Sequence, residues 1–163
     1  MNDPSLPSLA RISAIGARGP RIRELSQRQM EVILLRNTVG RIAYCSGARV
    51  ELFPIHYVFA DGAIYGRTSF GAKSVGWSRK PSVVLEVDEA DGLFDWRSVI
   101  VRGKLSLLRA SGVGAEPFAY LNALAAIKTL VPEAFTERDP VPARGALFRI
   151  VPAEMSGREA VSR

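Results

Sequence analysis

The sequence predicts a mainly β domain of the α+β class, built from antiparallel strands with a few flanking helices. Between residues 50 and 104, strand-length runs of apolar, β-branched or aromatic residues are separated by turn dipeptides. Such spacing is typical of antiparallel strands. The dipeptides are Asp61-Gly62, Lys80-Pro81 and Asp91-Gly92. Strands and helices do not alternate regularly along the chain, which argues against a doubly wound nucleotide-binding fold.

Length and composition indicate one globular domain. The chain has 163 residues, of which 47% are hydrophobic and 23% charged, and this length can bury a core without disulfides. We expect the domain to span residues 21–163 and a flexible arm, rich in Pro and Gly, to span residues 1–20. No apolar run reaches membrane-spanning length and the N-terminus lacks a hydrophobic signal core, so we expect a cytoplasmic protein without a membrane partner. The single cysteine, Cys45, excludes an internal disulfide.

The net charge of +6 does not by itself indicate a nucleic-acid partner. The 22 basic residues, mostly arginine, are scattered among 16 acidic ones, whereas nucleic-acid binding needs a basic face, usually with aromatic residues for stacking. The densest basic cluster lies near the N-terminus and comprises Arg11, Arg18, Arg21, Arg23 and Arg28. We therefore expect no nucleic-acid partner and, at most, a basic surface that attracts anions.

Local patterns predict the individual elements. Ser26 and Gln29 form a capping-box pattern, and Leu25 and Met30 could form the hydrophobic staple of the same helix. In the helix predicted near the C-terminus, Phe118, Leu121, Ala125 and Lys128 mark successive turns. Strands are expected over residues 40–46, 52–59, 64–68, 82–87, 96–103 and 146–151, and helices over about 26–37, 72–79 and 116–130.

Residues 68–73 form a candidate phosphate site. They read Thr-Ser-Phe-Gly-Ala-Lys and lie between a predicted strand and a short helix. The first turn of a helix has free N–H groups and the positive end of the helix dipole, and the hydroxyls of Thr68 and Ser69 with the ammonium of Lys73 add donors. Taken alone, these hydroxyls are more often plain helix caps, and such a lysine is usually a solvated charge.

The order and spacing of several segments resemble the pyridoxamine 5′-phosphate oxidase-like family, and more closely its small bacterial flavin- and nitroreductase-like members. The resemblance covers about residues 25–104, and more loosely residues 147–150 and 157–158. It implies a six-stranded antiparallel split β-barrel that binds FMN along its outer wall, at the interface of a homodimer. The segments that carry it are Gly40–Tyr44, Phe53-Pro54-Ile55-His56-Tyr57, Ile64-Tyr65, Gly71-Ala72-Lys73, Pro81–Val84 and Trp96–Val99.

The resemblance also implies where the cofactor lies. The segment Pro54, Ile55, His56 and Tyr57 would present backbone groups to the flavin ring. The phosphate and ribityl chain would lie against Arg67, Thr68, Ser69 and Lys73, and the pyrimidine edge or the phosphate side against Trp96, Ser98 and Val99. Nitroimidazole-reductase-like relatives tend to carry His where Arg67 stands, which puts that activity in doubt.

No residue pattern identifies catalytic side chains. The chain has no Ser/His/Asp order, no HExxH motif and no Cys/His cluster, and no metal is expected. His56 is the only histidine, and a lone histidine on a strand is more often packed or exposed than a general base. Glu86 and Asp88 stand two apart, as on the solvent face of a strand, rather than as paired catalytic acids. From spacing alone, Trp96 is more often a core residue.

The predicted function is therefore carried by the cofactor. We expect an FMN-dependent oxidoreductase that passes hydride or electrons to a small substrate, with NAD(P)H as a candidate electron donor. Three alternatives stay open: a deazaflavin (F420)-dependent reductase on the same barrel, a flavin- or haem-binding protein without turnover, and, more distantly, a basic nucleic-acid-binding regulator. Pyridoxamine phosphate itself is not the expected substrate, since no second set of basic residues for its phosphate is evident.

Overall fold

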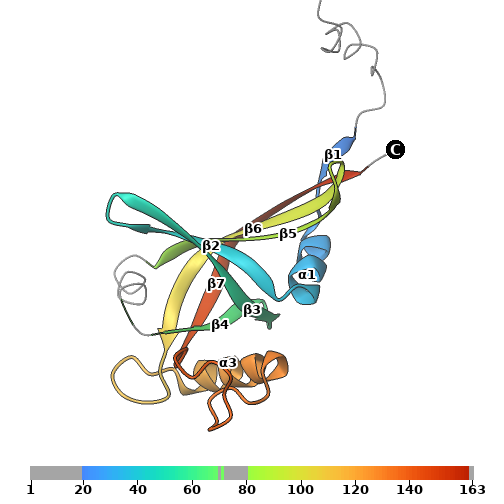
Figure 1. Ribbon diagram of the computed structural model, residues 1–163. Helices are drawn as coiled ribbons and strands as arrows, with labels where there is room; N and C mark the ends of the chain where they lie inside the picture. Colours follow the sequence, from blue (N-terminus) through green and yellow to red (C-terminus); the bar gives the residue numbers. More distant parts are fainter. Residues whose placement is uncertain (1–19, 70, 72–80, 162–163) are drawn as a thin grey trace, which may run out of the picture.

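The computed structural model describes residues 20–69, 71 and 81–161. Seven strands and two helices are formed by this part of the chain (Figure 1). The predicted helix at 72–79 and Lys73 lie outside the described residues. In chain order, the elements are β1 (Arg21–Glu24), α1 (Gln27–Arg36), β2 (Val39–Ser46), β3 (Arg49–Ala60), β4 (Ala63–Thr68), β5 (Ser82–Gly92), β6 (Asp95–Leu108), α3 (Pro117–Leu130) and β7 (Ala146–Val161).

Six of the strands close into a barrel. The strand order is β1-β7-β4-β3-β2-β5-β6, and β6 also pairs with β7, so that all strands except β1 form a ring. Every pairing is antiparallel. The predicted six-stranded antiparallel split barrel is thus confirmed, with one additional strand. β1 adds this seventh strand by pairing with the last four residues of β7.

The closing strand is longer than predicted because it pairs with different partners along its length. β4 pairs with residues 146–150 of β7 and β1 with residues 158–161, while β6 covers the other edge. Between these two partners, one edge of β7 has no strand beside it among the described residues. Pro152 lies in this interval, where a residue without an N–H group is tolerated. The strand predicted from the sequence ends at residue 151, directly before this proline.

Helix α1 forms as its sequence predicts. The Ser26 side chain accepts a hydrogen bond from the Gln29 backbone N–H and the Gln29 side chain accepts one from the Ser26 N–H, which completes the capping box. Met30, Ile33 and Leu34 face inward. At the far end of the helix, Arg36 and Asn37 bind the Glu89 carboxylate of β5. Through these contacts α1 is held against the barrel (Figure 1).

The barrel interior is filled by alternating side chains of its strands. Successive side chains of a strand point to opposite faces, and in β3 it is Phe53, Ile55, Tyr57 and Phe59 that point inward. Val83, Leu85 and Val87 of β5 do the same. Fully buried side chains from the other strands complete this core: Ile42, Ile64, Val99, Val101, Phe148 and Ile150. Because side chains fill the interior, a cofactor could bind only on the outer wall.

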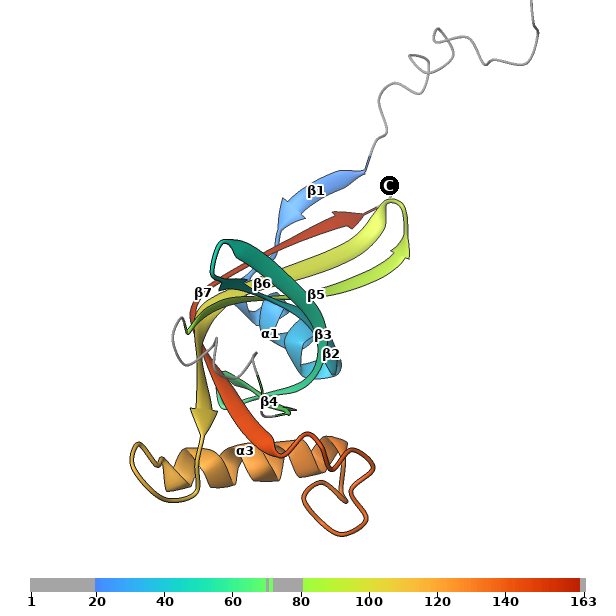
Figure 2. The same cartoon turned by 60° about the vertical axis from the view of Figure 1, so that its left-hand side comes forward.

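Helix α3 lies across the lower end of the barrel with an unexpected face inward (Figure 2). Its buried residues are Ala119, Ala123, Ala126 and Ile127. Phe118 and Leu121 belong to the residues that mark successive turns in the sequence, and their side chains are 85% and 56% exposed. Alanines have no long side chains, so they allow the helix to approach the strands closely, and the larger apolar residues are left on the outside.

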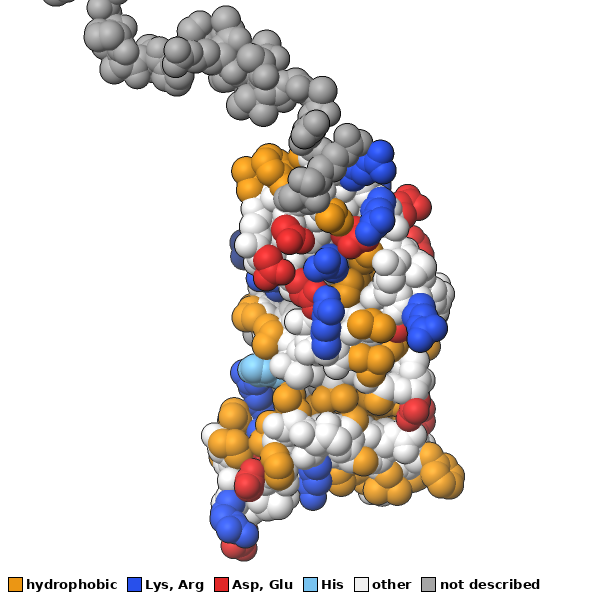
Figure 3. Space-filling view, turned by 90° about the vertical axis from the view of Figure 1, so that its right-hand side faces the viewer, with side chains coloured by type: hydrophobic (Ala, Val, Ile, Leu, Met, Phe, Trp, Pro, Cys, Tyr) orange, Lys and Arg blue, Asp and Glu red, His pale blue; other side chains and the backbone are white. Residues whose placement is uncertain are grey.

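The described surface has mixed charge. Figure 3 shows acidic and basic side chains interspersed over the upper part of one face and hydrophobic ones over the lower part, near α3. Among the described helices, none is both long and apolar enough to cross a membrane.

Candidate functional site

The β3 segment presents two of its four predicted contact residues outward. Pro54 and His56 are exposed on the outer wall, whereas Ile55 is partly buried in the core. Tyr57 is fully buried and its hydroxyl donates a hydrogen bond to the Leu34 carbonyl at 3.0 Å. Burial, and secondarily the charge of Glu89, raises the pKa of Tyr57. Ile55 and Tyr57 could therefore meet a ligand only through backbone groups.

At the end of β4, the side chain of Arg67 is bound within the chain. Its Nη1 and Nη2 donate to the two carboxylate oxygens of Asp139, each at 2.7 Å, and Nη2 also donates to the Val141 carbonyl at 3.0 Å. The guanidinium lies 5.4 Å from the centre of the Phe135 ring. The side chains of Arg67 and Asp139 are only 7% and 5% exposed. Arg67 thus holds the loop between α3 and β7, and a phosphate contact from its guanidinium stays a prediction.

Asp139 organises that loop. Besides Arg67, its carboxylate accepts hydrogen bonds from the backbone N–H groups of Phe135 and Val141. Phe135 adopts a positive φ of 62°, an uncommon conformation for a bulky residue. The hydrogen bonds from Arg67, followed by those from the backbone, hold the pKa of the Asp139 carboxyl well below its usual range. Sequence analysis missed Asp139, because no local pattern pairs it with a residue 72 positions away.

Two further predicted phosphate contacts, Thr68 and Ser69, follow Arg67 directly. Thr68 ends β4 and is partly exposed, and Ser69 follows it on the surface. Thr68 pairs with Ala146 at the start of β7, which fixes the backbone at this corner. The structure therefore brings Thr68 and Ser69 to the exit of β4, as expected.

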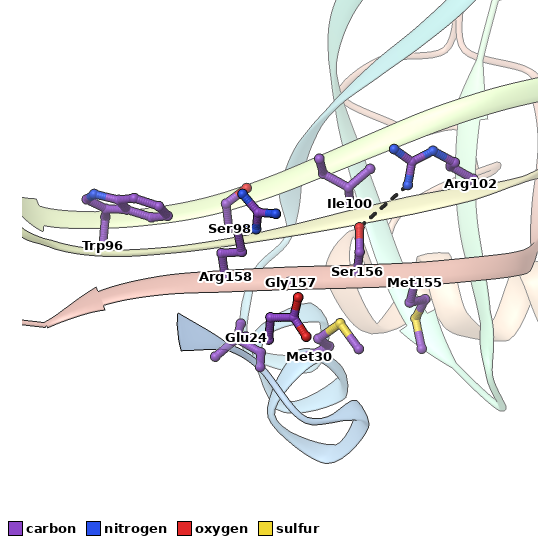
Figure 4. Close-up of a pocket in the computed structure, with 11 residues that line it drawn as sticks. Glu24, Met30, Trp96, Ser98, Ile100, Arg102, Met155, Ser156, Gly157 and Arg158 are labelled. Atoms are coloured by element: carbon purple, nitrogen blue, oxygen red, sulfur yellow. Dashed lines mark hydrogen bonds between the residues drawn. The ribbon is translucent and has the colours of Figure 1, made fainter. Parts of the chain in front are cut away.

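On β6, the structure separates the three predicted contacts into two faces. Val99 is fully buried in the core. Trp96 and Ser98 face outward and line a hollow of about 490 Å³ between β6, β7 and the start of α1 (Figure 4). Arg158 and Ser156 of β7 line the same hollow. The alternative interpretation of Trp96 as a core residue is therefore wrong, because its side chain lies on the outward face of β6.

A polar network lies on the outer wall beside this hollow. The Ser98 hydroxyl donates to Glu86 Oε1 at 3.1 Å, and Arg41 Nη1 donates to Glu86 Oε2 at 3.1 Å. Arg41 also binds the Asp88 carboxylate. Glu86 and Asp88 thus lie outward as predicted, on partly exposed side chains. Sequence analysis did not connect Glu86 with Ser98, because the hydrogen bond depends on the register between β5 and β6.

The predicted contacts that the structure describes fall into two groups on the wall, which are called half-sites below. The outer-wall row that starts at Pro54 of β3 continues through Arg41 and Glu86 to Ile100 of β6. Three steps between strands separate β3 from β6, which is about 14 Å along the wall. One half-site therefore comprises β3 and the end of β4, and the other comprises β6 and β7.

Comparison with known proteins identifies the family. The profile of the family described as Pyridoxamine 5′-phosphate oxidase matches residues 26–159. The chain belongs to this family. The match includes both half-sites and ends just beyond Arg158.

Solved structures share the fold. A FAD-binding protein from Mesorhizobium loti is 27% identical, with a TM-score of 0.70 over 86% of this chain and 99% of that one. The FAD-binding protein from Mycobacterium smegmatis is 23% identical, with a TM-score of 0.63 over 85% and 98%. An uncharacterized protein from Rhizobium meliloti is 26% identical over 91 residues, which are 55% of this chain and 60% of that protein. The chain thus matches less than two thirds of the length of this curated relative.

Proposed function

We propose that the protein is a flavin-dependent oxidoreductase that binds FMN at the seam of a homodimer. The observation that carries this proposal is the family match over residues 26–159, which includes both half-sites. The structural likeness to a FAD-binding protein at 27% identity supports a flavin as the ligand class. When bound, a flavin supplies hydride and electron transfer, and the chain binds and orients it.

The residues present fit a flavin. Thr68 and Ser69 offer hydroxyl and amide donors at a strand exit, and Lys73 follows four residues later in the sequence. A phosphate ester carries nearly two negative charges, which such donors satisfy. The exposed side of β3 at Pro54 and His56 offers a surface for a planar ring. Trp96 and Ser98 offer an apolar and a polar contact at the second half-site.

A second copy of the chain would complete the site. Three strand steps separate Pro54 and His56 of β3 from Trp96 and Ser98 of β6, and Thr68 pairs with Ala146, at the opposite end of β7 from Arg158. Apolar residues on the outer wall remain exposed: Val39 by 51%, Val50 by 73% and Leu52 by 61%. A two-fold interface would bury such a patch and bring β6 of the partner to the β3 half-site. It would generate two equivalent flavin sites.

FAD is the second candidate cofactor. Two of the similar structures are those of FAD-binding proteins. FMN and FAD share the isoalloxazine ring and the first phosphate, so the same contacts would serve both. They differ in the adenylate part, which only FAD carries.

The direct test is the cofactor itself. We expect the purified protein to show the visible absorption of an oxidised flavin, and the flavin released by heat to co-migrate with FMN in chromatography. Release of FAD would support the second candidate, and uptake of F420 without FMN would favour the deazaflavin alternative. Oxidation of NAD(P)H with quinone or nitro acceptors would support turnover. A colourless protein that binds no flavin would contradict the proposal.

The phosphate corner can be tested separately. We expect Thr68→Ala combined with Lys73→Ala to weaken FMN binding by about tenfold or more, because each lost charge-assisted or hydroxyl hydrogen bond contributes roughly 1 kcal/mol or more. Riboflavin, which lacks the phosphate, should bind the variant and the wild type alike. Lys128→Ala, on the exposed side of α3, is the matched control. Unchanged FMN affinity in the double variant would contradict the phosphate assignment.

A further inference from the structure

A second hollow, at the start of α3, contains polar groups that the proposed flavin site does not use. It has a volume of about 400 Å³ and lies between the first turn of α3 and the strands β4 and β7. This volume is within the range of small-molecule sites. None of the described residues that are predicted to contact the flavin lines it. Its polar lining comprises Tyr65, Glu116, Asn122 and Arg149, and Pro117 and Phe118 form its apolar side.

Arg149 has one donor without a partner in this hollow. Its Nη2 donates to Glu116 Oε2 at 2.8 Å, whereas its Nε is buried and donates to no atom of the described residues. An unpaired buried donor is costly. Glu116 thus pairs with only one of the two N–H groups that a carboxylate can bind side by side. Its side chain is 51% exposed and makes no cap hydrogen bond to α3, so it can move away without loss to the helix.

Tyr65 adds a second donor to the same place. It lies directly opposite Arg149 in the β4–β7 ladder, is 4% exposed and packs in the apolar cluster under α3. A buried tyrosine usually gives its hydroxyl a partner, as Tyr57 does. Among the described residues, the hydroxyl of Tyr65 has none, and it is not sealed from solvent. Because Tyr65 lines the hollow, this hydroxyl is available to a ligand there.

We propose that the hollow binds a small organic acid with an apolar body. The carboxylate of the ligand replaces Glu116 on Nε and Nη2 of Arg149 and accepts a hydrogen bond from Tyr65. The apolar body covers Phe118, which is 85% exposed. The first turn of α3, a helix of 14 residues, adds the positive end of its dipole. A phosphate carries nearly two charges and fits a single arginine less well. This site goes beyond the proposed function and does not depend on a bound flavin.

Benzoate is the probe for this site. It is titrated into the full-length protein, and binding is followed by the chemical shifts of the backbone amides. Binding should saturate, with shifts confined to residues 65, 116–122 and 149. Benzamide has the same shape without the charge and should bind about tenfold or more weakly, because hydrogen bonds to a charged acceptor are the stronger ones. Inorganic phosphate should also bind more weakly than benzoate.

Four variants test the assigned groups. Arg149→Gln should weaken benzoate binding by about tenfold or more and Tyr65→Phe by about threefold or more. Tyr65→Phe should keep the melting temperature of the wild type, since the hydroxyl has no partner in the described fold. Glu116→Gln should bind benzoate about threefold or more tightly, because a neutral amide competes less for the guanidinium. Arg144→Gln removes the same charge from an exposed loop residue and should bind benzoate like the wild type.

Several results would overturn this inference. They are equal binding of benzoate and benzamide, wild-type affinity in Arg149→Gln or Tyr65→Phe, tighter binding of phosphate, and no binding of benzoate. Shifts centred on Pro54 or Trp96 would place benzoate at the half-sites and would overturn it as well. The visible absorption of the flavin is recorded on the same samples, so the proposed function is tested separately from this site.

Discussion

At the scale of single residues, Gly66 shows how closely the barrel is packed. A Cβ atom at this position would lie 2.2 Å from Cζ of Phe148, which is itself fully buried. Gly66 and Phe148 are directly opposite in the β4–β7 ladder. The aromatic ring therefore occupies the space that any larger residue would need, one position before Arg67.

We expect Gly66→Ala to destabilise the protein by about 1–3 kcal/mol or more, because overpacking a full core forces side chains and backbone to shift. Chemical denaturation measures this loss. Gly92→Ala is the control, since its Cβ would meet nothing within 4 Å, and it should lie within about 0.5 kcal/mol of the wild type. Equal stability of the two variants would show that the Phe148 ring can move aside.

Asp139 is the residue from which we expect a pH dependence of the α3–β7 loop. Its pKa is lowered in the folded protein, chiefly by hydrogen bonds from Arg67. A lowered carboxyl pKa stabilises the fold above the unfolded value of about 4 and this stability is lost as the pH falls through the folded value.

We therefore expect Asp139→Asn to lower the melting temperature at about pH 7, and the difference from the wild type to shrink towards about pH 3. Thermal unfolding monitored by circular dichroism measures it. Asp61→Asn, at an exposed turn residue with positive φ, should have little effect, because Asn tolerates this conformation as well as Asp. A difference that is constant with pH would exclude the carboxylate as its cause.

At the scale of elements, Glu159 ties β1 to the barrel. It is 3% exposed, and its two oxygens accept from Arg23 Nε at 2.6 Å and Arg97 Nε at 3.2 Å. One carboxylate on β7 thus links β1 on one side with β6 on the other. β1 is only four residues long, so it depends on such side-chain contacts.

Glu159→Gln should release β1. We expect amide hydrogen exchange in residues 21–24 to increase by about tenfold or more, while that of β4 stays unchanged, because local opening follows local stability. Glu154→Gln is the control, since its pair with Arg102 at 3.4 Å is exposed and such pairs contribute little. Unchanged protection of β1 in Glu159→Gln would mean that the backbone ladder alone holds this strand.

At the scale of the whole molecule, two exposed apolar surfaces are candidates for the interface of the proposed dimer. Leu52 lies on the β2–β3 wall next to Ala43 and is 61% exposed, and Leu121 of α3 is 56% exposed. Only the β2–β3 wall adjoins the half-site at Pro54 and His56. The proposed dimer therefore uses the wall and leaves α3 outside.

We expect Leu52→Glu to give a monomer that loses bound flavin, because a charge would be buried at the seam without a partner. Light scattering coupled to size-exclusion chromatography measures the mass. Leu121→Glu should remain a dimer with flavin. The reverse result would assign the interface to α3. A wild-type protein that is monomeric and still binds flavin would contradict a flavin site at a dimer interface.

The sequence by itself determined what depends on local periodicity and local chemistry. The strand alternation, the capping box at Ser26 and Gln29, and the fold family follow from neighbouring residues and their order, and the structure reproduces them. Only the tertiary structure decided which distant groups meet. Strand register brings Ser98 to Glu86. The docking of α3 and the loop after it turns the alanine face inward and brings Asp139 to Arg67. Register and docking result from packing over the whole barrel, so no stretch of neighbouring residues contains that information.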